Sequence, residues 1–267
     1  MTTAPSRGVP RLAGRLTDYW VTVLKRTWRG SVITSFLMPF LYLTAMGVGL
    51  GSFVDDNAAG QGLGGVTYLA FIAPGLLATT AMQTGVSEST YPVMGGFKWH
   101  RSYFAMAASP LNPSDIVFAQ LAFVGVRILV TCGVFLAIIA GFGALHSWWG
   151  GLLAVVVVTL LGLAYAAPVT GLAARMKNES GFSLIFRLGL IPMFLFSGAF
   201  FPITQLPVAV RWLAYVTPIW HGVDLSRMLT LGQVDEWPAL GHVAYISAWL
   251  VAGWLFAVKG FERRLSE

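Results

Sequence analysis

Charged residues are scarce in this chain. Asp, Glu, Lys and Arg make up only 10% of its 267 residues, whereas 56% are hydrophobic, and the mean hydropathy is +0.71. A soluble domain of this size needs more charge to cover its surface, so the composition indicates an integral membrane protein. The net charge of +6 does not indicate nucleic-acid binding, because the basic residues cluster beside apolar runs, where the orientation of a membrane protein requires them.

The residues needed for several kinds of chemistry are also few or missing. Cys132 is the only cysteine, which excludes a disulfide framework and a thiolate metal cluster. The four histidines are scattered, and His221 with Asp224, three residues apart, is too small a group for a metal site. The sequence has no P-loop motif, no G-x-S-x-G motif and no H-E-x-x-H motif. We therefore predict no catalytic residue, no metal and no ATP site within the chain.

Long apolar runs, by contrast, are abundant. A helix needs about 20 mostly apolar residues to cross roughly 30 Å of hydrocarbon, and six segments reach that length. Glycine-rich residues 141–151 divide the longest uncharged stretch into two of them. The sequence therefore predicts an all-α integral membrane fold with six transmembrane helices, in a single domain over residues 1–267. The predicted spans are Val32–Phe53, Val66–Ser87, Ile116–Ala140, Trp148–Ala173, Phe182–Phe201 and Leu240–Val258.

The basic residues lie mostly on one side of these predicted spans. The N-terminal segment, the second and fourth loops and the C-terminal tail hold 13 of the 17 Lys and Arg residues. The opposite loops hold only Arg211 and Arg227, and the remaining two arginines fall within spans. The positive-inside rule then predicts that the N and C termini are both cytoplasmic.

An amphipathic segment precedes the first predicted span. In Pro10–Gly30, polar and mostly basic residues recur every three or four positions, and aromatic and aliphatic residues fill the opposite face. Such a helix, ending at Gly30, lies in the plane of the lipid headgroups rather than crossing the bilayer. The alternative is a soluble arm that happens to be amphipathic.

The longest predicted cytoplasmic loop is residues 88–115, between spans two and three. Gly95-Gly96 and the prolines Pro110 and Pro113 enclose a helix-compatible stretch, and Ser114 is available as an N-cap. This pattern predicts a compact helix whose aromatic and basic side chains would suit a docking surface. Alternatively, the helix only packs beneath the bundle. The candidate docking side chains are Phe97, Lys98, Trp99, His100, Arg101, Tyr103 and Phe104.

The predicted outer segment, residues 202–239, is too apolar for a solvated loop. Its two apolar stretches, Leu206–Val216 and Ile219–Leu231, are divided by Thr217-Pro218, and each is too short to span a bilayer. Backbone groups at membrane depth must form hydrogen bonds within the protein, so the segment predicts a pair of re-entrant or interfacial helices.

Two of the predicted spans contain an arginine. Arg127 lies about eleven residues into span three, and Arg187 lies about five residues into span five. An intramembrane arginine is by default a hypothesis of function. The alternative is that each side chain reaches the headgroups or forms an internal pair, and Glu88, at the inner end of span two, is a candidate partner for Arg127.

The most specific motif runs from Phe196 to Pro202, Phe-Ser-Gly-Ala-Phe-Phe-Pro, and is followed by Leu206-Pro207, Thr217-Pro218, His221 and Arg227. A second motif, Ala108-Ser109-Pro110-Leu111, ends the inner loop. With these motifs the chain resembles, over almost its whole length, a permease of the type 2 ATP-binding-cassette (ABC) exporters. The branch it resembles contains the lipo-oligosaccharide exporters of nodulation and the daunorubicin-type drug exporters.

The resemblance implies an interfacial elbow helix, six spans, a cytoplasmic coupling helix and a re-entrant hairpin, in the inner membrane of a bacterium. It also implies that two permeases, identical or related, form one pore above two ABC ATPase subunits, which bind ATP and Mg²⁺. This chain would then bind membrane lipids but no cofactor of its own. The coupling role would fall on Lys98–Ala107, and the candidate gate or pathway residues are Glu88, Arg127, Arg187, Phe200, Phe201 and His221.

Three functions remain open at this point. The first is the membrane subunit of an ATP-driven exporter for an amphiphilic substrate, such as a lipid-linked glycan, a lipid or a hydrophobic drug. The second is a lipid-modifying membrane enzyme that uses His221, Asp224 and His242. The third is a transporter or channel that works without an ATPase. The substrate and the identity of the second permease are not predicted.

Overall fold

The computed structural model describes residues 36, 37, 39–56, 63 and 65–266. These residues form helices joined by turns, and none of them lies in a β-strand, which confirms the predicted all-α class. The predicted interfacial helix at residues 10–30 lies outside the described residues and stays a prediction.

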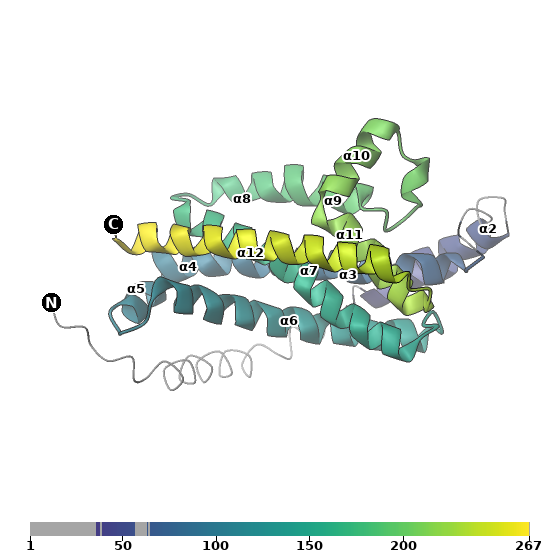
Figure 1. Ribbon diagram of the computed structural model, residues 1–267, viewed down its shortest axis with the longest axis horizontal. Coiled ribbons are helices and arrows are strands. Elements are labelled where there is room, and N and C mark those ends of the chain that lie inside the picture. Colours follow the sequence, from purple (N-terminus) through teal and green to yellow (C-terminus); the bar gives the residue numbers. More distant parts are fainter. Residues whose placement is uncertain (1–35, 38, 57–62, 64, 267) are drawn as a thin grey trace.

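In the part of the chain that the structure describes, four helices are long and apolar enough to cross a membrane. The first combines α3 (Tyr68–Ser89) and α4 (Tyr91–Lys98), and the others are α6 (Pro113–Gly141), α7 (Trp148–Arg175) and α12 (Glu236–Ser266). They run side by side along the long axis of the molecule (Figure 1). Four of the six predicted spans are therefore confirmed as helices of sufficient length.

The other two predicted spans differ from these four. The first, Val32–Phe53, lies partly outside the described residues, which are helical in η1 (Leu43–Leu50) and α2 (Gly51–Asp55). The fifth consists of α8 (Ser180–Leu184), η3 (Ile185–Leu190) and α9 (Ile191–Phe196), a shorter apolar helix. It ends at Phe196 rather than at Phe201, because Gly198 takes a left-handed conformation with φ of +79°. The total of six spans stays a prediction.

The inner loop is more helical than the sequence suggests. Gly95-Gly96 do not break the chain but lie inside α4, and the loop helix is α5 (Ser102–Ala107). The N-cap of α6 is Asn112 rather than Ser114, because Asn112 and Asp115 form a capping box around Pro113, the first residue of the helix. The longest run of exposed residues in this loop, 98–101, lies at the turn between α4 and α5.

The outer segment forms two short helices, as predicted. They are α10 (Val208–Val216) and α11 (Pro218–Leu231), and the break between them falls at Thr217-Pro218; a single turn, η4 (Ile203–Gln205), precedes them. α11 packs against α3, α7 and α12 and buries much of its surface, whereas α10 lies outside the bundle (Figure 1). Whether this pair re-enters a membrane stays a prediction.

Glycines set how closely the main helices approach. A Cβ atom at Gly85 of α3 would lie 2.3 Å from the carbonyl oxygen of Gly162 on α7. Likewise, a Cβ at Gly260 of α12 would lie 2.8 Å from the carbonyl oxygen of Gly171 on α7. Small residues at such crossings let helix backbones pack directly, so these glycines of α7 serve contacts within the chain.

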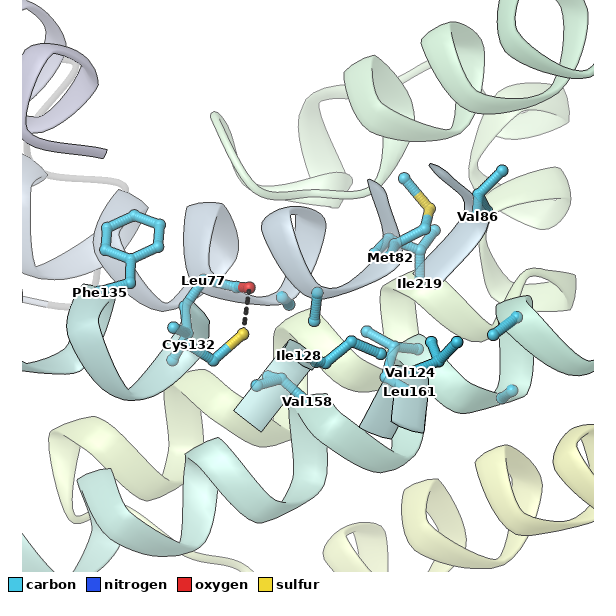
Figure 2. Close-up of a cluster of buried hydrophobic side chains, with 14 of the residues drawn as sticks. Leu77, Met82, Val86, Val124, Ile128, Cys132, Phe135, Val158, Leu161 and Ile219 are labelled. Atoms are coloured by element: carbon cyan, nitrogen blue, oxygen red, sulfur yellow. Dashed lines mark hydrogen bonds between the residues drawn. The ribbon is translucent and has the colours of Figure 1, made fainter. Parts of the chain in front are cut away.

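The core between these helices is almost entirely apolar. Figure 2 shows side chains of α3, α6, α7 and α11 meeting around Ile128. The buried thiol of Cys132 points toward the carbonyl oxygen of Leu77, 4.0 Å away, so this cysteine is a packing residue. The core holds α3 and α6 in the positions from which their polar side chains form the sites described next.

Candidate functional site

The predicted docking side chains lie on the turn between α4 and α5, at the end of the bundle that also carries the C terminus (Figure 1). Trp99, His100 and Arg101 are exposed there, and 53% of Trp99 is accessible. Arg101 is the one non-glycine residue in the described part of the chain with positive φ, at +51°. Its guanidinium carbon lies 5.5 Å from the ring centre of Phe104. The turn therefore presents bulky aromatic and cationic groups outward.

Two of the predicted docking residues lie behind this turn. Phe97 and Tyr103 are buried, and their rings pack against Phe261 of α12 with centroid distances of 4.9 and 5.0 Å. The hydroxyl of Tyr103 donates a hydrogen bond of 3.0 Å to Gln120 of α6. These two rings support the turn from behind and connect it to α6 and α12, instead of projecting from the surface.

A glycine makes room for this support. A Cβ atom at Gly96 would lie 2.3 Å from the ring of Tyr103, so the tyrosine packs directly on the backbone of α4. A cavity of about 370 Å³ lies beside this contact, between α4, α5 and α6. Its lining includes the buried Tyr103 and the exposed Trp99 and His100. The cavity therefore opens at the turn between α4 and α5, which we name the docking turn.

Phe104, half-buried, packs its ring against Phe97 at 5.8 Å. Lys98, the last of the predicted docking residues, forms an ion pair at the same end of the bundle. Its Nζ lies 3.0 Å from Oε1 of Glu179, in the connection between α7 and α8. Both side chains are more than 40% exposed, so solvent screens the pair and its contribution to stability is small. The pair nevertheless joins two connections that are 81 residues apart.

A larger cavity, of about 740 Å³, lies between α3, α6 and α9. Polar side chains of α3 line it at positions 80, 83, 84 and 87, a spacing that places them on one helix face. Residues of α9 supply an apolar wall. We name this space the lateral cavity. Its polar residues are Thr79, Thr80, Gln83, Thr84, Ser87, Glu88, Arg127 and Thr131, and its apolar wall includes Ile191, Phe194 and Leu195.

An ion pair occupies one part of the lateral cavity. Nε of Arg127 lies 3.1 Å from Oε1 of Glu88, and each side chain is 20% exposed. The predicted partnership of these two residues is confirmed. Because the pair is mostly desolvated, removing one partner costs more than it would at a surface. The hydroxyl and amide groups beside it on α3 were missed by the sequence interpretation, although their helical spacing in an otherwise apolar span was visible.

The other predicted pathway residues are dispersed. Arg187 is exposed on η3 and is not among the residues that line the lateral cavity. Phe200 packs its ring against Phe194 of the cavity wall at 4.9 Å, and its carbonyl accepts a hydrogen bond from the hydroxyl of Tyr68. Phe201 is half-buried in the turn that follows α9. The structure thus places Phe200 behind the cavity wall and does not place Arg187 in the cavity.

His221 belongs to a different site, on the side of α11 that faces α12. Its Nδ1 lies 2.8 Å from Nδ1 of His242, and its Nε2 lies 3.0 Å from the carbonyl oxygen of Tyr215. Nε2 of His242 in turn lies 3.2 Å from Oδ2 of Asp224. Burial lowers the pKa of His221, which favours its neutral form. No group of three or more His, Cys, Asp or Glu in the described part of the chain is arranged to hold a metal.

Arg227 connects α11 to α3 and to the turn after α9. Its guanidinium donates to the carbonyl oxygens of Phe71, at 3.3 Å, and Gly198, at 2.8 Å. The same group lies 3.9 Å from the ring centre of Phe71. Burial lowers the pKa of Arg227 to about 10, so the guanidinium stays charged at neutral pH. Sequence interpretation placed Arg227 in the outer segment but did not reveal this structural role.

Comparison of the sequence with those of known proteins identifies the family. The sequence profile of the ABC-2 type transporter matches residues 16–231. Nodulation protein J of Rhizobium leguminosarum bv. viciae is 31% identical over 92% of this chain and 95% of that protein. Nodulation protein J of Rhizobium meliloti (strain 1021) is 27% identical over 92% of this chain and 94% of that protein. The chain belongs to the ABC-2 type transporter family and is a membrane subunit of a transporter.

Proposed function

We propose that this chain is the transmembrane subunit of an ATP-driven exporter that moves an amphiphilic substrate out of the cytoplasm or the inner leaflet. The observation that carries the proposal is the lateral cavity, which has a polar wall on α3 and an apolar wall on α9. A substrate with a polar head and a hydrocarbon portion finds a partner on each wall. A lipid-linked glycan, a lipid and a hydrophobic drug all have this character.

In this proposal, ATP acts on the chain through the turn between α4 and α5. Two ABC ATPase subunits, which hold ATP and Mg²⁺, would contact the exposed Trp99, His100 and Arg101. Movement would pass to the bundle through Tyr103 and Phe261, because these buried rings join the turn to α6 and α12. The turn and the C-terminal end of α12 lie at one end of the bundle (Figure 1), and both would be cytoplasmic in a bacterial inner membrane.

The pathway would form where two permeases, identical or related, bring their lateral cavities together. The pair of Glu88 and Arg127 would then mark the inner part of the pathway, because Glu88 lies near the end of α3 that leads to α4 and the docking turn. Phe200 and Phe201 would contribute to an apolar outer gate. Arg187, exposed on η3, would contact lipid headgroups or the second permease.

The enzyme alternative is less well supported by the geometry of the histidines. Each ring nitrogen of His221 and His242 already lies within hydrogen-bond distance of a protein atom. A general base needs a free nitrogen within reach of its substrate. The alternative of transport without an ATPase makes a different prediction, since substrate would then move in liposomes that contain this chain alone.

Reconstitution tests the proposal. The chain is purified together with its ABC ATPase and placed in liposomes, and transport of a fluorescent lipid is measured with and without ATP. We expect ATP-dependent transport, and we expect Trp99→Ala to reduce it at least tenfold while the purified chain remains equally stable. Trp149→Ala is the matched control, because Trp149 is 80% exposed at the opposite end of the bundle, at the start of α7. Transport by the chain without any ATPase would overturn the proposal.

A further inference from the structure

The contacts of His221, Asp224 and His242 form a continuous chain of hydrogen bonds between α11 and α12, which we name the histidine chain. It begins at the carbonyl oxygen of Tyr215, passes through both rings and ends at the carboxyl of Asp224. The three donor–acceptor distances along it are 3.0, 2.8 and 3.2 Å. The side chain of His242 is only 7% exposed, whereas that of Asp224 is 29% exposed. His221 and Tyr215 are also partly exposed, so His242 is the one buried side chain of the histidine chain.

Two neutral histidines carry one hydrogen fewer than the hydrogen bonds of the histidine chain require. A backbone carbonyl and an ionised carboxylate accept hydrogen bonds but cannot donate them, so both ends are acceptors. Three hydrogen bonds need three hydrogens, one in each gap. Two neutral imidazoles supply only two, one on each ring. With both rings neutral and Asp224 ionised, one gap would bring two lone pairs together in a mostly buried place, which is unfavourable.

We propose that the histidine chain is a binding site for a single proton, shared by His221, His242 and Asp224. With that proton, His221 donates from Nε2 to Tyr215, and His242 donates from Nδ1 to His221. The third hydrogen lies between His242 and Asp224, either as an imidazolium beside a carboxylate or as a neutral imidazole beside a carboxylic acid. Either distribution leaves the site neutral as a whole. The proposal does not depend on the exporter function or on an ATPase.

The groups around the histidine chain limit it to one proton. Arg227, one helical turn after Asp224, interacts electrostatically with that carboxyl, and as a cation it disfavours a net positive charge on the site. The rings of Trp220 and Tyr245 enclose His221 at centroid distances of 4.8 and 4.1 Å, and the phenols of Tyr215 and Tyr165 belong to the same surroundings. A second proton would make both imidazoles cationic, and both Nδ1 atoms, 2.8 Å apart, would then be donors.

Occupancy by the proton has a structural consequence for α11. The histidine chain joins α11 to α12, while Ser226 and Arg227 join α11 to α3 through the carbonyl oxygens of Pro74 and Phe71. Loss of the proton removes one hydrogen bond from the α12 side and leaves the α3 side intact. As pH rises above the range in which the site is filled, the equilibrium constant for the attachment of α11 to α12 therefore falls. It falls by up to tenfold for each pH unit.

Asp224→Asn tests the proposal with a side chain of nearly the same shape. The amide of the new side chain donates to Nε2 of His242, so two neutral rings complete all three hydrogen bonds without an extra proton. Wild-type and D224N proteins, purified in detergent at pH 7, are denatured in the presence of a pH indicator, and the protons released are counted. The wild type should release one proton more than D224N, because the two unfolded chains hold equal numbers of protons once the free aspartate is ionised. An equal release from the two proteins would overturn the proposal.

A second measurement applies if D224N does not fold. ¹⁵N and ¹³C NMR spectra of the wild type in nanodiscs report the charge of each imidazole and carboxyl directly, and His100→Gln with His146→Gln removes the other two histidine signals. We expect an imidazolium or a protonated aspartate at pH 7 that titrates as one unit with the two rings. A spectrum with two neutral imidazoles and only ionised aspartates would contradict the proposal.

Discussion

The two ends of the bundle use polar residues in opposite ways. At the predicted cytoplasmic end, called the inner end below, Trp99, His100 and Arg101 are exposed on a short turn, and buried aromatic rings hold that turn in place. At the outer end, polar groups of α11 are largely withdrawn from solvent and bonded to protein atoms, as Arg227 and His221 show. The polar groups of the turn between α4 and α5 are available to bind a partner, whereas those of α11 are used within the chain.

This difference indicates where each end can act. Exposed aromatic and cationic side chains contribute binding energy only when a partner covers them, so the inner end is suited to an intermolecular contact. Buried polar groups in hydrogen-bonded networks specify one arrangement of the helices, and they are costly to disrupt. The outer end is therefore suited to holding α10 and α11 on the bundle. The following predictions test this comparison, from the largest expected effect to the smallest.

Removing the guanidinium at the outer end should have the largest effect on stability. Arg227→Met leaves the carbonyl oxygens of Phe71 and Gly198 without their donor and should lower the free energy of unfolding by about 3 kcal/mol. Thermal unfolding of the purified protein measures this loss. Arg227→Lys, which keeps the charge but loses the planar fork, should lose less. Equal stability of the two variants would show that the hydrogen bonds to the carbonyls contribute little.

Adding one methyl group at the inner end should have the next largest effect. In Gly96→Ala the new Cβ would lie 2.3 Å from the ring of Tyr103, which is fixed by Gln120 and Phe261. We expect a loss of about 2 kcal/mol in stability, measured by thermal unfolding, together with a loss of coupling between ATP hydrolysis and transport.

Gly133→Ala in α6 is the matched control for this change, because nothing lies within 4 Å of its Cβ position. It should be neutral or stabilising by up to about 1 kcal/mol, since alanine favours helix more than glycine does. If both variants lose the same stability, the packing of Tyr103 on Gly96 is not what fixes the docking turn.

The ion pair in the lateral cavity should have an intermediate effect. Glu88→Gln, Arg127→Gln and the double variant form a cycle, and we expect a coupling energy of about 1 kcal/mol between the two residues. Thermal unfolding supplies the stabilities, and transport assays show whether the pair also affects the pathway. Additive effects of the two changes would indicate that the 3.1 Å contact contributes nothing beyond the separate side chains.

The surface ion pair at the inner end should have the smallest effect. Lys98→Gln removes the contact with Glu179, and because both side chains are more than 40% exposed, we expect a change below about 0.5 kcal/mol. The difference should be smaller in 500 mM salt than in 50 mM salt, because salt screens exposed charges. A loss above about 1 kcal/mol would show that the two inner connections depend on each other more than their exposure implies.

Part of the candidate site was visible in the sequence because its signal is local. The break at Thr217-Pro218 predicts two short helices, since proline cannot continue the first of them. The pairing of Glu88 with Arg127 follows from two charges in apolar spans that need partners. The polar face of α3 also had a helical spacing in the sequence, although only the lateral cavity makes its role evident.

Other features depend on which helices meet. His221 and Asp224 lie one turn apart on α11, but His242 is eighteen residues further along the chain, on α12, and no spacing rule brings it to them. The burial of Phe97 and Tyr103 behind the docking turn depends in the same way on Phe261. Gly95 and Gly96 suggested a break in the sequence, because glycine weakens an isolated helix. In the structure they allow aromatic rings to pack on α4.

The sequence by itself determined that this is a helical membrane protein, where its helices lie and which motifs it shares with the exporter permeases. Those features depend on composition and on periodicities of a few residues, which the chain carries locally. Only the tertiary structure decided that polar residues of α3 and α6 line the lateral cavity and that those of α11 and α12 form the histidine chain. The reason is that close glycine contacts between helices far apart in the sequence fix the distances across them.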